Sequence, residues 1–506
     1  MACNVTILCQ GTRGRSGQAR SLYASAPLAS TLHAPTTMTT PPPLLVRNAT
    51  LPDGRQGQFV LAEGGLIRAV GPALAMPAAP PGALEIDAQG WLLSPPFVDA
   101  HFHMDSTLSH GRPRVNASGT LLEGIQLWGE LKPLLTEEDI AERALEYCDW
   151  AVARGLLAIR SHVDVCDDRL LAVRALLEVK RRVAPYLDLQ LVAFPQDGLL
   201  RSPGALANLK RALDLGVEVV GGIPHFEGTM AQGAESVKIL CELAAARGLR
   251  VDMHCDESDD PMSRHIETLA SHTQRLGLQG RVTGSHLTSM HSMDNSYVSK
   301  LLPLIAEAGV HAVANPLINI TLQGRHDHYP KRRGMTRVPE LLAAGVNVGF
   351  GHDCVLDPWY ALGSACMLEV AAMGLHVAQM TSLAGQRACF DAVTVNNARI
   401  LGLQGYGLDV GCRADMVLLQ ARSPEEALRL RAQRLCVVRA GVVVSRMAPA
   451  VAELALPGRP HAVDFTRGFH TTGRGAWEQP PSLESIPPQE SLGNSGTGTS
   501  AQRGTT

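Results

Sequence analysis

The fold is decided by one stretch of the chain, Leu92-Leu93-Ser94-Pro95-Pro96-Phe97-Val98-Asp99-Ala100-His101-Phe102-His103-Met104-Asp105. It is an apolar run that ends in His-x-His, and side chains two positions apart point to the same side of a β-strand. We therefore predict a buried strand whose carboxyl end presents His101 and His103 on one side. Two such imidazoles can bind one divalent metal ion. Taken alone, the pattern also fits two ordinary histidines in a loop, so the rest of the chain has to decide.

Seven further apolar runs follow this stretch, with helical patterns between them. The eight predicted strands are Leu93–Ala100, Leu157–His162, Leu189–Phe194, Val217–Gly222, Arg250–His254, Val282–His286, Val310–Asn315 and Asn347–Gly351. Thr136–Arg154 and Ser236–Arg247 are two of the helical patterns. Eight strand–helix units over residues 94–405 predict an α/β fold, the (β/α)8 TIM barrel.

The segments on either side of the barrel, residues 44–93 and 406–466, carry short strand-like runs separated by turns such as Pro52-Asp53-Gly54. Neither segment could bury a core of its own. We therefore predict that both chain ends together form one small β-sandwich. Residues 1–43 are expected to be disordered or untranslated, with Met38 as the true start, although their composition also resembles a transit peptide. Residues 467–506 are rich in Gly, Ser, Thr, Pro and Gln and are expected to be disordered.

The composition excludes several classes of protein. The 506 residues carry a formal net charge of −3, which favours neither nucleic acid nor an anionic membrane as a partner. No apolar run reaches the length of a membrane-spanning helix. The 11 cysteines show no C-x-x-C pair and no regular spacing, which argues against a disulfide-stapled secreted protein. We expect a cytoplasmic enzyme that acts on a small molecule and has neither a nucleic-acid nor a membrane partner.

Polar and ionisable side chains follow nearly every predicted strand, at the end where TIM barrels place their active sites. In chain order they are His101 and His103, His162 and Asp164, Gln196, His225 and Glu227, His254 with Glu257, His286, Asn315, and His352 with Asp353. Burying so many imidazoles and carboxylates together without a metal ion would be costly. Their convergence therefore favours a metal site over a set of unrelated core histidines.

This constellation resembles the amidohydrolase superfamily, whose pattern is His-x-His on the first strand, histidines on the fifth and sixth, and an aspartate on the eighth. Longer motifs resemble the bacterial cytosine deaminases, and the similarity runs from about residue 44 to residue 465. These motifs are Val192-Ala193-Phe194-Pro195-Gln196, Ile223-Pro224-His225-Phe226-Glu227, Asp252-Met253-His254-Cys255-Asp256-Glu257, Tyr329-Pro330-Lys331-Arg332-Arg333-Gly334, Gly351-His352-Asp353 and Asp357-Pro358-Trp359-Tyr360.

The resemblance implies one divalent metal ion, Fe²⁺ or Zn²⁺. Its ligands would be His101, His103, His254 and Asp353. Glu257 would carry a proton to a ring nitrogen of the substrate, and His286 would orient the attacking hydroxide, whose proton Asp353 would take. No lysine stands at the end of the third or fourth strand, where two-metal relatives place a bridging lysine, so one ion is expected.

The resemblance also implies contacts with the substrate. Gln196 would hydrogen-bond the amide edge of a ring, and Trp359 would pack on that ring, unless it is a core residue. Cys354 departs from the cytosine deaminases, which have a second aspartate after Asp353. The change removes a negative charge, and we expect Cys354 to reshape the pocket around the ring. No role is assigned to the remaining strand-end and loop residues His162, Asp164, His225 and Arg325.

The function expected from this resemblance is hydrolytic deamination of a cytosine-like heterocycle, namely cytosine, 5-methylcytosine or isocytosine. A metal-activated hydroxide would attack the ring and ammonia would leave. The alternatives are deamination of creatinine or a triazine, and ring opening of a cyclic amide as in hydantoinases and dihydroorotases. A catalytically dead barrel would lack a ligand or the proton shuttle, and none is missing. The relatives are oligomeric, so a homo-oligomer is expected.

Overall fold

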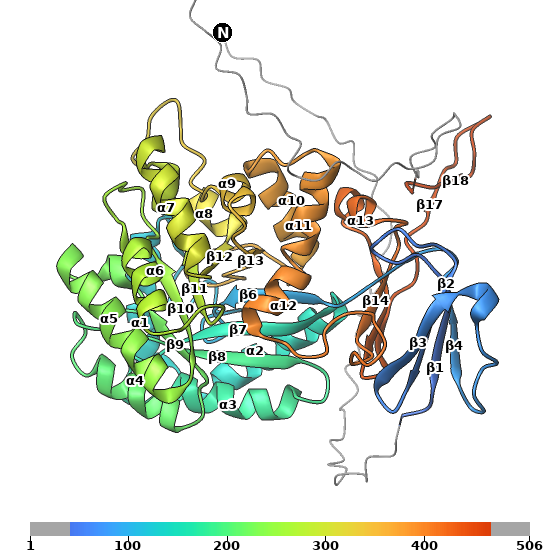
Figure 1. Cartoon of the computed structure of the whole chain (residues 1–506), viewed down its shortest axis with the longest axis horizontal. Helices are drawn as coiled ribbons and strands as arrows, with labels where there is room; N and C mark the ends of the chain where they lie inside the picture. The colour runs from blue at the N-terminus through green and yellow to red at the C-terminus, as the bar shows by residue number, and fades with distance from the viewer. Residues whose placement is uncertain (1–40, 467–506) are drawn as a thin grey trace, which may run out of the picture. The chain divides into compact units, whose positions relative to one another are not determined.

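The computed structural model describes residues 41–466, and Figure 1 shows how their helices and strands are arranged. Eight parallel strands follow one another in the central sheet. They are β6 Phe97–Phe102, β7 Leu156–Asp164, β8 Asp188–Phe194, β9 Val219–Gly222, β10 Arg250–Cys255, β11 Val282–His286, β12 His311–Ala314 and β13 Val348–Phe350. A parallel bridge between Phe102 and Asp353 joins the two ends of the sheet. The sheet is therefore nearly closed, and the predicted TIM barrel is confirmed.

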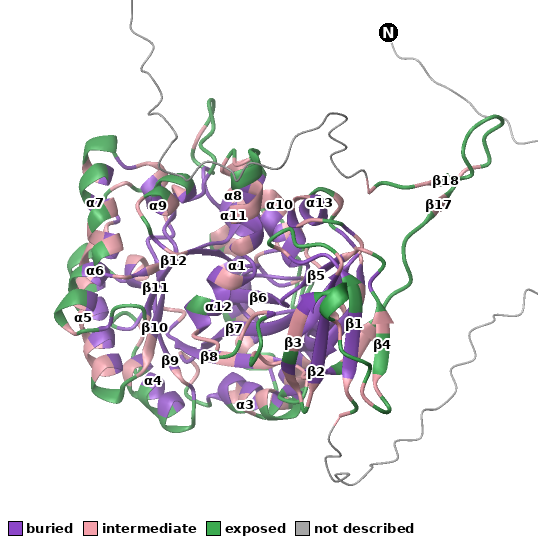
Figure 2. Cartoon of the chain, turned by 45° about the vertical axis from the view of Figure 1, so that its right-hand side comes forward, coloured by how far each residue is buried: buried purple, intermediate pink, exposed green. Residues whose placement is uncertain are grey.

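Helices cover the outside of this sheet, so that its strands are buried (Figure 2). The helices of this part of the chain are α1 Leu121–Leu131, α2 Glu137–Ala153, α3 Leu171–Val183, α4 Ala205–Asp214, α5 Met230–Arg247, α6 His265–Arg275, α7 Asn295–Glu307, α8 Pro316–Leu322, α9 Val338–Ala343, α10 Met367–Val377, α11 Leu383–Asp391 and α12 Val395–Leu401. Of these, α1 and α8 lie at the carboxyl ends of the strands. Short 3-10 helices occupy Ala73–Ala75, Lys132–Leu134, Pro224–Phe226 and Thr288–His291. Helix α2 begins where predicted, because the Thr136 hydroxyl caps it by accepting from the Asp139 N–H. No helix within residues 41–466 combines the length and the apolar character that crossing a bilayer requires.

The stretch that opens the barrel forms two strands, whereas a single strand over Leu93–Ala100 is predicted. Strand β5 (Leu92–Ser94) pairs with a strand of the sandwich, and β6 begins only at Phe97 in the barrel. Pro95 and Pro96 lie between them, and proline has no N–H to donate to a β-ladder. The prediction of one continuous strand is therefore wrong, because the two prolines divide it.

Segments from both ends of the described chain form two four-stranded sheets, in the orders β3-β2-β1-β4 and β16-β15-β14-β5. Their remaining strands are β1 Leu44–Ala49, β2 Gln58–Glu63, β3 Leu66–Pro72, β4 Leu84–Asp87, β14 Met416–Leu419, β15 Arg434–Arg439 and β16 Val442–Arg446, with helix α13 Pro424–Leu430 between β14 and β15 and a hairpin β17 Ala452–Glu453 with β18 Ala462–Val463 after them. Val46, Val60, Met416 and Val438 share one buried core across the two sheets. The predicted β-sandwich from both chain ends is confirmed.

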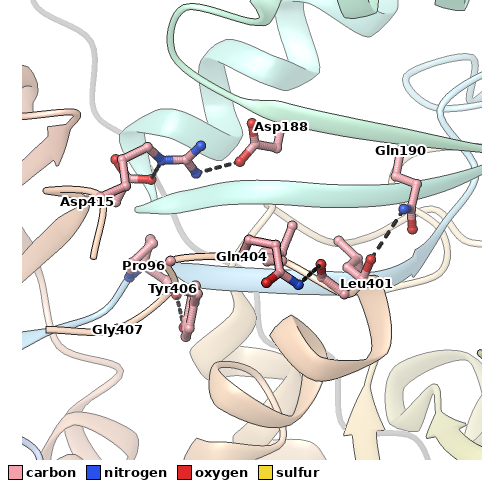
Figure 3. Close-up of a pocket in the computed structure, with 12 residues that line it drawn as sticks. Pro96, Asp188, Gln190, Leu401, Gln404, Tyr406, Gly407 and Asp415 are labelled. Atoms are coloured by element: carbon pink, nitrogen blue, oxygen red, sulfur yellow. Dashed lines mark hydrogen bonds and ion pairs between the residues drawn. The ribbon is translucent and has the colours of Figure 1, made fainter. Parts of the chain in front are cut away.

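For the domains we propose the division 44–93, 94–405 and 406–466 that the sequence predicts, except that Ser94 belongs to the sandwich as the last residue of β5. The expectations for residues 1–40 and 467–506 fall outside the described residues. Sandwich and barrel meet at the amino ends of the barrel strands, around a cavity of about 270 Å³ (Figure 3). Asp188 of β8 accepts from Arg413 at 2.5 Å and from Arg439 at 2.7 Å, and Asp415 accepts from both arginines. Residues at this end of a barrel contribute to stability rather than to catalysis.

A buried ion pair lies inside the barrel, on the amino side of the strand ends. Arg160 donates to Asp252 at 2.8 Å, and both side chains are fully buried. The Arg160 guanidinium also donates to the Gln190 side chain at 2.7 Å and to the carbonyl of Ile400 at 2.8 Å. Every polar group of the pair therefore has a partner, which is the condition under which a buried ion pair persists.

We predict that Arg160→Met lowers the free energy of unfolding by about 3–5 kcal/mol, because Asp252 is left as a buried charge without its partner. Chemical unfolding followed by circular dichroism measures the loss. The double variant Arg160→Met/Asp252→Asn should recover part of it, since the unpaired charge is then gone. An equal loss in the single and double variants would contradict this account.

Candidate active site

The carboxyl ends of the barrel strands surround one cavity of about 50 Å³. It is lined by His103, Leu121, Ile125, Gln196, Ile223, His225, Phe226, His254, Glu257, His286, Ile318, Leu322, Asp353, Cys354 and Trp359. All the predicted site residues except His101 belong to this lining. His101 lies next to it, with its ring centroid 4.5 Å from that of His254. Residues far apart in the sequence thus meet at one place, as the strand-end pattern predicts.

Backbone hydrogen bonds between β6 and the segment after β13 hold two of these residues in place. The Asp353 N–H donates to the His101 carbonyl at 2.8 Å, and the His103 N–H donates to the Asp353 carbonyl at 3.0 Å. The buried Asp99 carboxylate accepts from the backbone N–H groups of His101 and His352, both at 3.1 Å. Burial raises the pKa of Asp99 to about 8. These bonds close the barrel at the position where the first and last strand present their ionisable side chains.

Two overlapping groups of buried donor atoms could hold a metal ion. One consists of His101, His103, His162 and His254, the other of His101, His254, His286 and Asp353, with the donor atoms of each group within 4.8 Å of one another. Both ring nitrogens of His101 and of His162, and Nδ1 of His254, are buried and have no hydrogen-bond partner in the protein. Buried polar atoms are normally paired, so these nitrogens call for an external partner.

The distances between donors fit a divalent ion. Asp353 Oδ1 lies 3.4 Å from Nε2 of His101 and 3.4 Å from Nε2 of His103, while Nε2 of His103 and Nε2 of His254 are 2.9 Å apart. Two donors that each lie about 2.1 Å from one tetrahedral ion are about 3.4 Å apart. Imidazole and carboxylate together suit zinc, iron or manganese.

The protonation state of the imidazoles also suits the binding of a metal ion. Burial lowers the pKa of His101, His103, His254 and His286 well below the ordinary value for histidine. These rings are therefore neutral at pH 7, and neutral imidazole is the form that binds metals.

Three residues at the cavity have the chemistry of general acids and bases. Glu257 Oε1 lies 3.5 Å from Nδ1 of His286, and Nε2 of His286 lies 3.7 Å from Oδ2 of Asp353. The amide of Asn319 lies 2.9 Å from Nδ1 of His286 and fixes the ring. Burial, and next the charge of Asp353, raises the pKa of Glu257 well above its usual value. Glu257 can therefore hold a proton at neutral pH.

The backbone at these residues is unusual. His286 has φ +72°, Asp353 has φ +71° and Asp256, beside Glu257, has φ +55°. Residues with a side chain rarely adopt this left-handed region, and where they do the surrounding structure has to hold them there. The Asp256 carboxylate does so at its own position, because it accepts from the backbone N–H groups of His265 and Ile266 at 3.0 and 2.9 Å.

The three predicted substrate contacts also line the cavity. Cys354 is buried and its Sγ lies 3.7 Å from Oδ1 of Asp353. Burial raises the pKa of the Cys354 thiol well above its usual value, so the side chain is neutral. Trp359 is half-buried, with its ring centroid 6.5 Å from that of His103. Gln196 enters the lining from the loop after β8. The role of each residue stays a prediction, since geometry alone does not test it.

The four residues left without a role lie in different surroundings. His162 belongs to the first group of donors, and His225 lines the cavity with Nδ1 3.2 Å from the His254 carbonyl. Asp164 accepts from the Trp128 indole at 2.9 Å. Arg325 donates to the Gly119 carbonyl at 2.7 Å from an exposed position.

Sequence reasoning missed the apolar part of the lining. Leu121 and Ile125 come from α1, Ile223 and Phe226 from the segment after β9, and Ile318 and Leu322 from α8. Such side chains also occur on every helix that packs on a barrel. The available signal is positional, because α1 follows the strand end with His101 and His103, and α8 follows the strand end with the polar residue Asn315.

Comparisons with known proteins agree with this geometry. The model of the amidohydrolase family matches residues 84–445. A crystal structure of 5-methylcytosine deaminase from Klebsiella pneumoniae, liganded with 5-fluorocytosine, has a TM-score of 0.79 and 42% identity, and the match covers 82% of this chain and 100% of that one. N-isopropylammelide isopropyl amidohydrolase of Pseudomonas sp. (strain ADP) is 29% identical over 71% of this chain and 87% of its own length. Pterin deaminase of Rhizobium rhizogenes is 30% identical over 79% of this chain and 91% of its own length. This chain therefore belongs to the amidohydrolase family, the hydrolases of C–N bonds.

Proposed function

We propose that this protein is a metal-dependent hydrolytic deaminase of a cytosine-like heterocycle, with 5-methylcytosine as the preferred ring over cytosine and isocytosine. The observation that carries the proposal is the convergence of Glu257, His286 and Asp353 on one small cavity. The likeness to the 5-methylcytosine deaminase of Klebsiella pneumoniae supports the same substrate class.

The small cavity at the strand ends, of about 50 Å³, supports a single small ring as the substrate.

We assign the metal ligands as predicted, His101, His103, His254 and Asp353. Two observations support this assignment. The distances among these donors suit one ion, and several of their buried ring nitrogens have no hydrogen-bond partner in the protein. When bound, the ion supplies the Lewis acidity that makes water a nucleophile near neutral pH. His162 and His286 are neighbours of this set, and His286 remains free to orient the attacking water.

The chain's own residues handle the protons. Asp353 takes the proton of the attacking water, while His286 holds that water against the ring carbon. Glu257, which is protonated because of its burial, donates to the adjacent ring nitrogen. It then accepts the hydroxyl proton of the tetrahedral intermediate and delivers this proton to the leaving amine, and the proton held by Asp353 restores the acid form of Glu257. The exocyclic C–N bond breaks, a C–O bond takes its place, and ammonia leaves. Gln196 hydrogen-bonds the amide edge of the ring, and Trp359 covers its face.

Cys354 favours a ring that carries a methyl group. Its neutral side chain stands beside Asp353, and the lining of the same cavity includes the apolar side chains of Ile223, Ile318 and Leu322. An apolar pocket gains about 0.8 kcal/mol for each buried methylene or methyl carbon. An aspartate at this position would add a charge whose hydration opposes such a contact.

We predict that Cys354→Asp lowers the ratio of kcat/KM for 5-methylcytosine to that for cytosine about tenfold or more, because one methyl group is worth about 10- to 200-fold in a matched pocket. Steady-state ammonia release with both compounds measures the ratio. Cys354→Ser, which keeps the size and the neutral charge, is the matched control and should change the ratio far less. A ratio that stays constant in Cys354→Asp would remove Cys354 from the specificity pocket.

The proposed function is tested by an ammonia-release screen over cytosine, 5-methylcytosine, isocytosine, creatinine and hydroxylated triazines, with the metal content of the same sample measured. The triazines belong in the screen because of the relative from Pseudomonas. Ring opening of a hydantoin or dihydroorotate without ammonia release would favour the cyclic amidohydrolase alternative. If only the triazines released ammonia, the proposed substrate would be a triazine and not a pyrimidine.

A further inference from the structure

Helix α1 forms one wall of the active-site cavity. Its residues Leu121 and Ile125 line the cavity directly. Gly124 packs on the Trp359 indole so closely that a Cβ at this position would lie 2.3 Å from Cδ1 of that ring. The orientation of Trp359 therefore depends on where α1 lies.

Two residues near the end of α1 tie this helix to a buried carboxylate. The Trp128 indole N–H donates to Asp164 Oδ2 at 2.9 Å, and the Lys132 ammonium donates to the same oxygen at 3.0 Å. The Asp164 side chain is only 3% exposed, and it is fixed further because its Oδ1 accepts from the Cys166 N–H at 2.7 Å. The centroid of the Trp128 ring also lies 6.0 Å from that of the Trp359 ring.

Lys132 also binds the loop after β8, which carries Gln196. Lys132 donates to Asp197 at 2.6 Å, and Asp197 directly follows Gln196. The Lys132 side chain is 16% exposed, so this cation is held close to the protein interior. One ammonium group therefore connects the helix that supports Trp359 with the loop that presents Gln196. The bond from Lys132 to Asp164 alone would hold the end of α1, so the second bond, to Asp197, adds a connection to the loop.

We propose that Lys132, together with Asp164 and Asp197, is a positioning residue for the deamination, which we call the Lys132 bridge. It holds α1 over the substrate and sets the spacing between Trp359 on the face of the ring and Gln196 at its edge. The substrate in this inference comes from the proposed function. The contacts of the Lys132 bridge are observed in the structure and do not depend on that function.

The test compares Lys132→Met, which keeps the length of the side chain and removes its charge, with Arg114→Met. Arg114 pairs with Glu123 and Glu130 of the same helix, and its own side chain is 42% exposed. Ion pairs of exposed side chains contribute little. In Lys132→Met we expect kcat/KM to fall about tenfold to a hundredfold, mostly through KM, because the ring is no longer held between its two contacts. Lys132→Arg should restore much of the affinity, and Arg114→Met should behave as the wild type.

A second readout does not depend on activity. Amide hydrogen exchange over residues 121–131 should be faster in Lys132→Met and nearly unchanged in Arg114→Met. Unchanged exchange in Lys132→Met would overturn the bridge whatever the activity is, and faster exchange with unchanged KM and kcat would overturn its positioning role. If Lys132→Met does not fold, Asp197→Asn removes only the more exposed partner and carries the same expectations. Absence of ammonia release from the wild-type enzyme with every ring would refute the proposed function instead, and the exchange experiment would still decide on the bridge.

Discussion

The Glu257→Gln variant is expected to lose nearly all ammonia release, with kcat lowered about 100- to 10,000-fold, the usual contribution of a general acid or base. Glutamine keeps the shape of the side chain and its hydrogen-bonding atoms but cannot transfer a proton. Glu257 is buried at the cavity, 3.5 Å from His286, with its pKa raised above the ordinary value by burial. The loss should therefore appear in kcat rather than in KM.

Two controls make this result specific. The metal content of Glu257→Gln should equal that of the wild type, since Glu257 is not among the proposed ligands. Glu307→Gln, at an exposed position at the end of α7, should keep full activity. If Glu257→Gln retained a tenth or more of the wild-type kcat with normal metal content, the proton would have to travel by another group.

The second large effect concerns the metal ligands. His103→Ala and His254→Ala are expected to lose the bound ion and all activity, because each removes a donor from the proposed set of four. His162→Ala should keep the ion with an affinity reduced about 10- to 100-fold, the usual cost of losing a group that surrounds the ligands. Elemental analysis after dialysis, and titration of the metal-free protein with Zn²⁺, measure the difference.

The comparison of His103→Ala with His162→Ala decides which of the two groups of donor atoms binds the ion. His103 and His162 occur only in the group without Asp353, and yet Asp353 lies 3.4 Å from His103. If His162→Ala lost the ion as completely as His103→Ala, then His162 would have to be counted as a ligand. Asp353→Asn would then retain the ion and lose only the proton transfer.

Much of the fold could be predicted because the barrel strands are buried on both faces and read as short apolar runs. The boundary between sandwich and barrel could not. The run from Leu92 to Phe102 is buried throughout and mostly apolar, and only Pro95 and Pro96 separate two strands that belong to different sheets. Pairing of β5 with β14 depends on residues remote in the sequence, so no local pattern announces it.

Part of the candidate site could likewise be predicted from the sequence, and part of it could not. The convergence of His101, His103, His254 and Asp353 was predictable because strand ends of one barrel meet wherever they occur in the sequence, whereas their role as ligands stays a prediction. His162 was ambiguous, because a histidine two positions before a strand end can be a core residue or a ligand. The contact of Asn319 with His286 and the bridge from Lys132 to Asp164 and Asp197 join side chains on separate elements. Only the folded arrangement reveals such contacts.

The pairing of β5 with β14 has a consequence for how this protein is made. β5 lies just ahead of the strand that carries His101, and its partner Met416–Leu419 is synthesised only after all eight barrel strands. Contacts between such distant segments form slowly, because closing a long loop costs entropy before the contact stabilises anything. A nascent chain is therefore expected to hold β5 unpaired until β14 has been synthesised, and unpaired strand edges promote aggregation. The sheet that adjoins the strand bearing His101 is thus completed late in the synthesis of the chain.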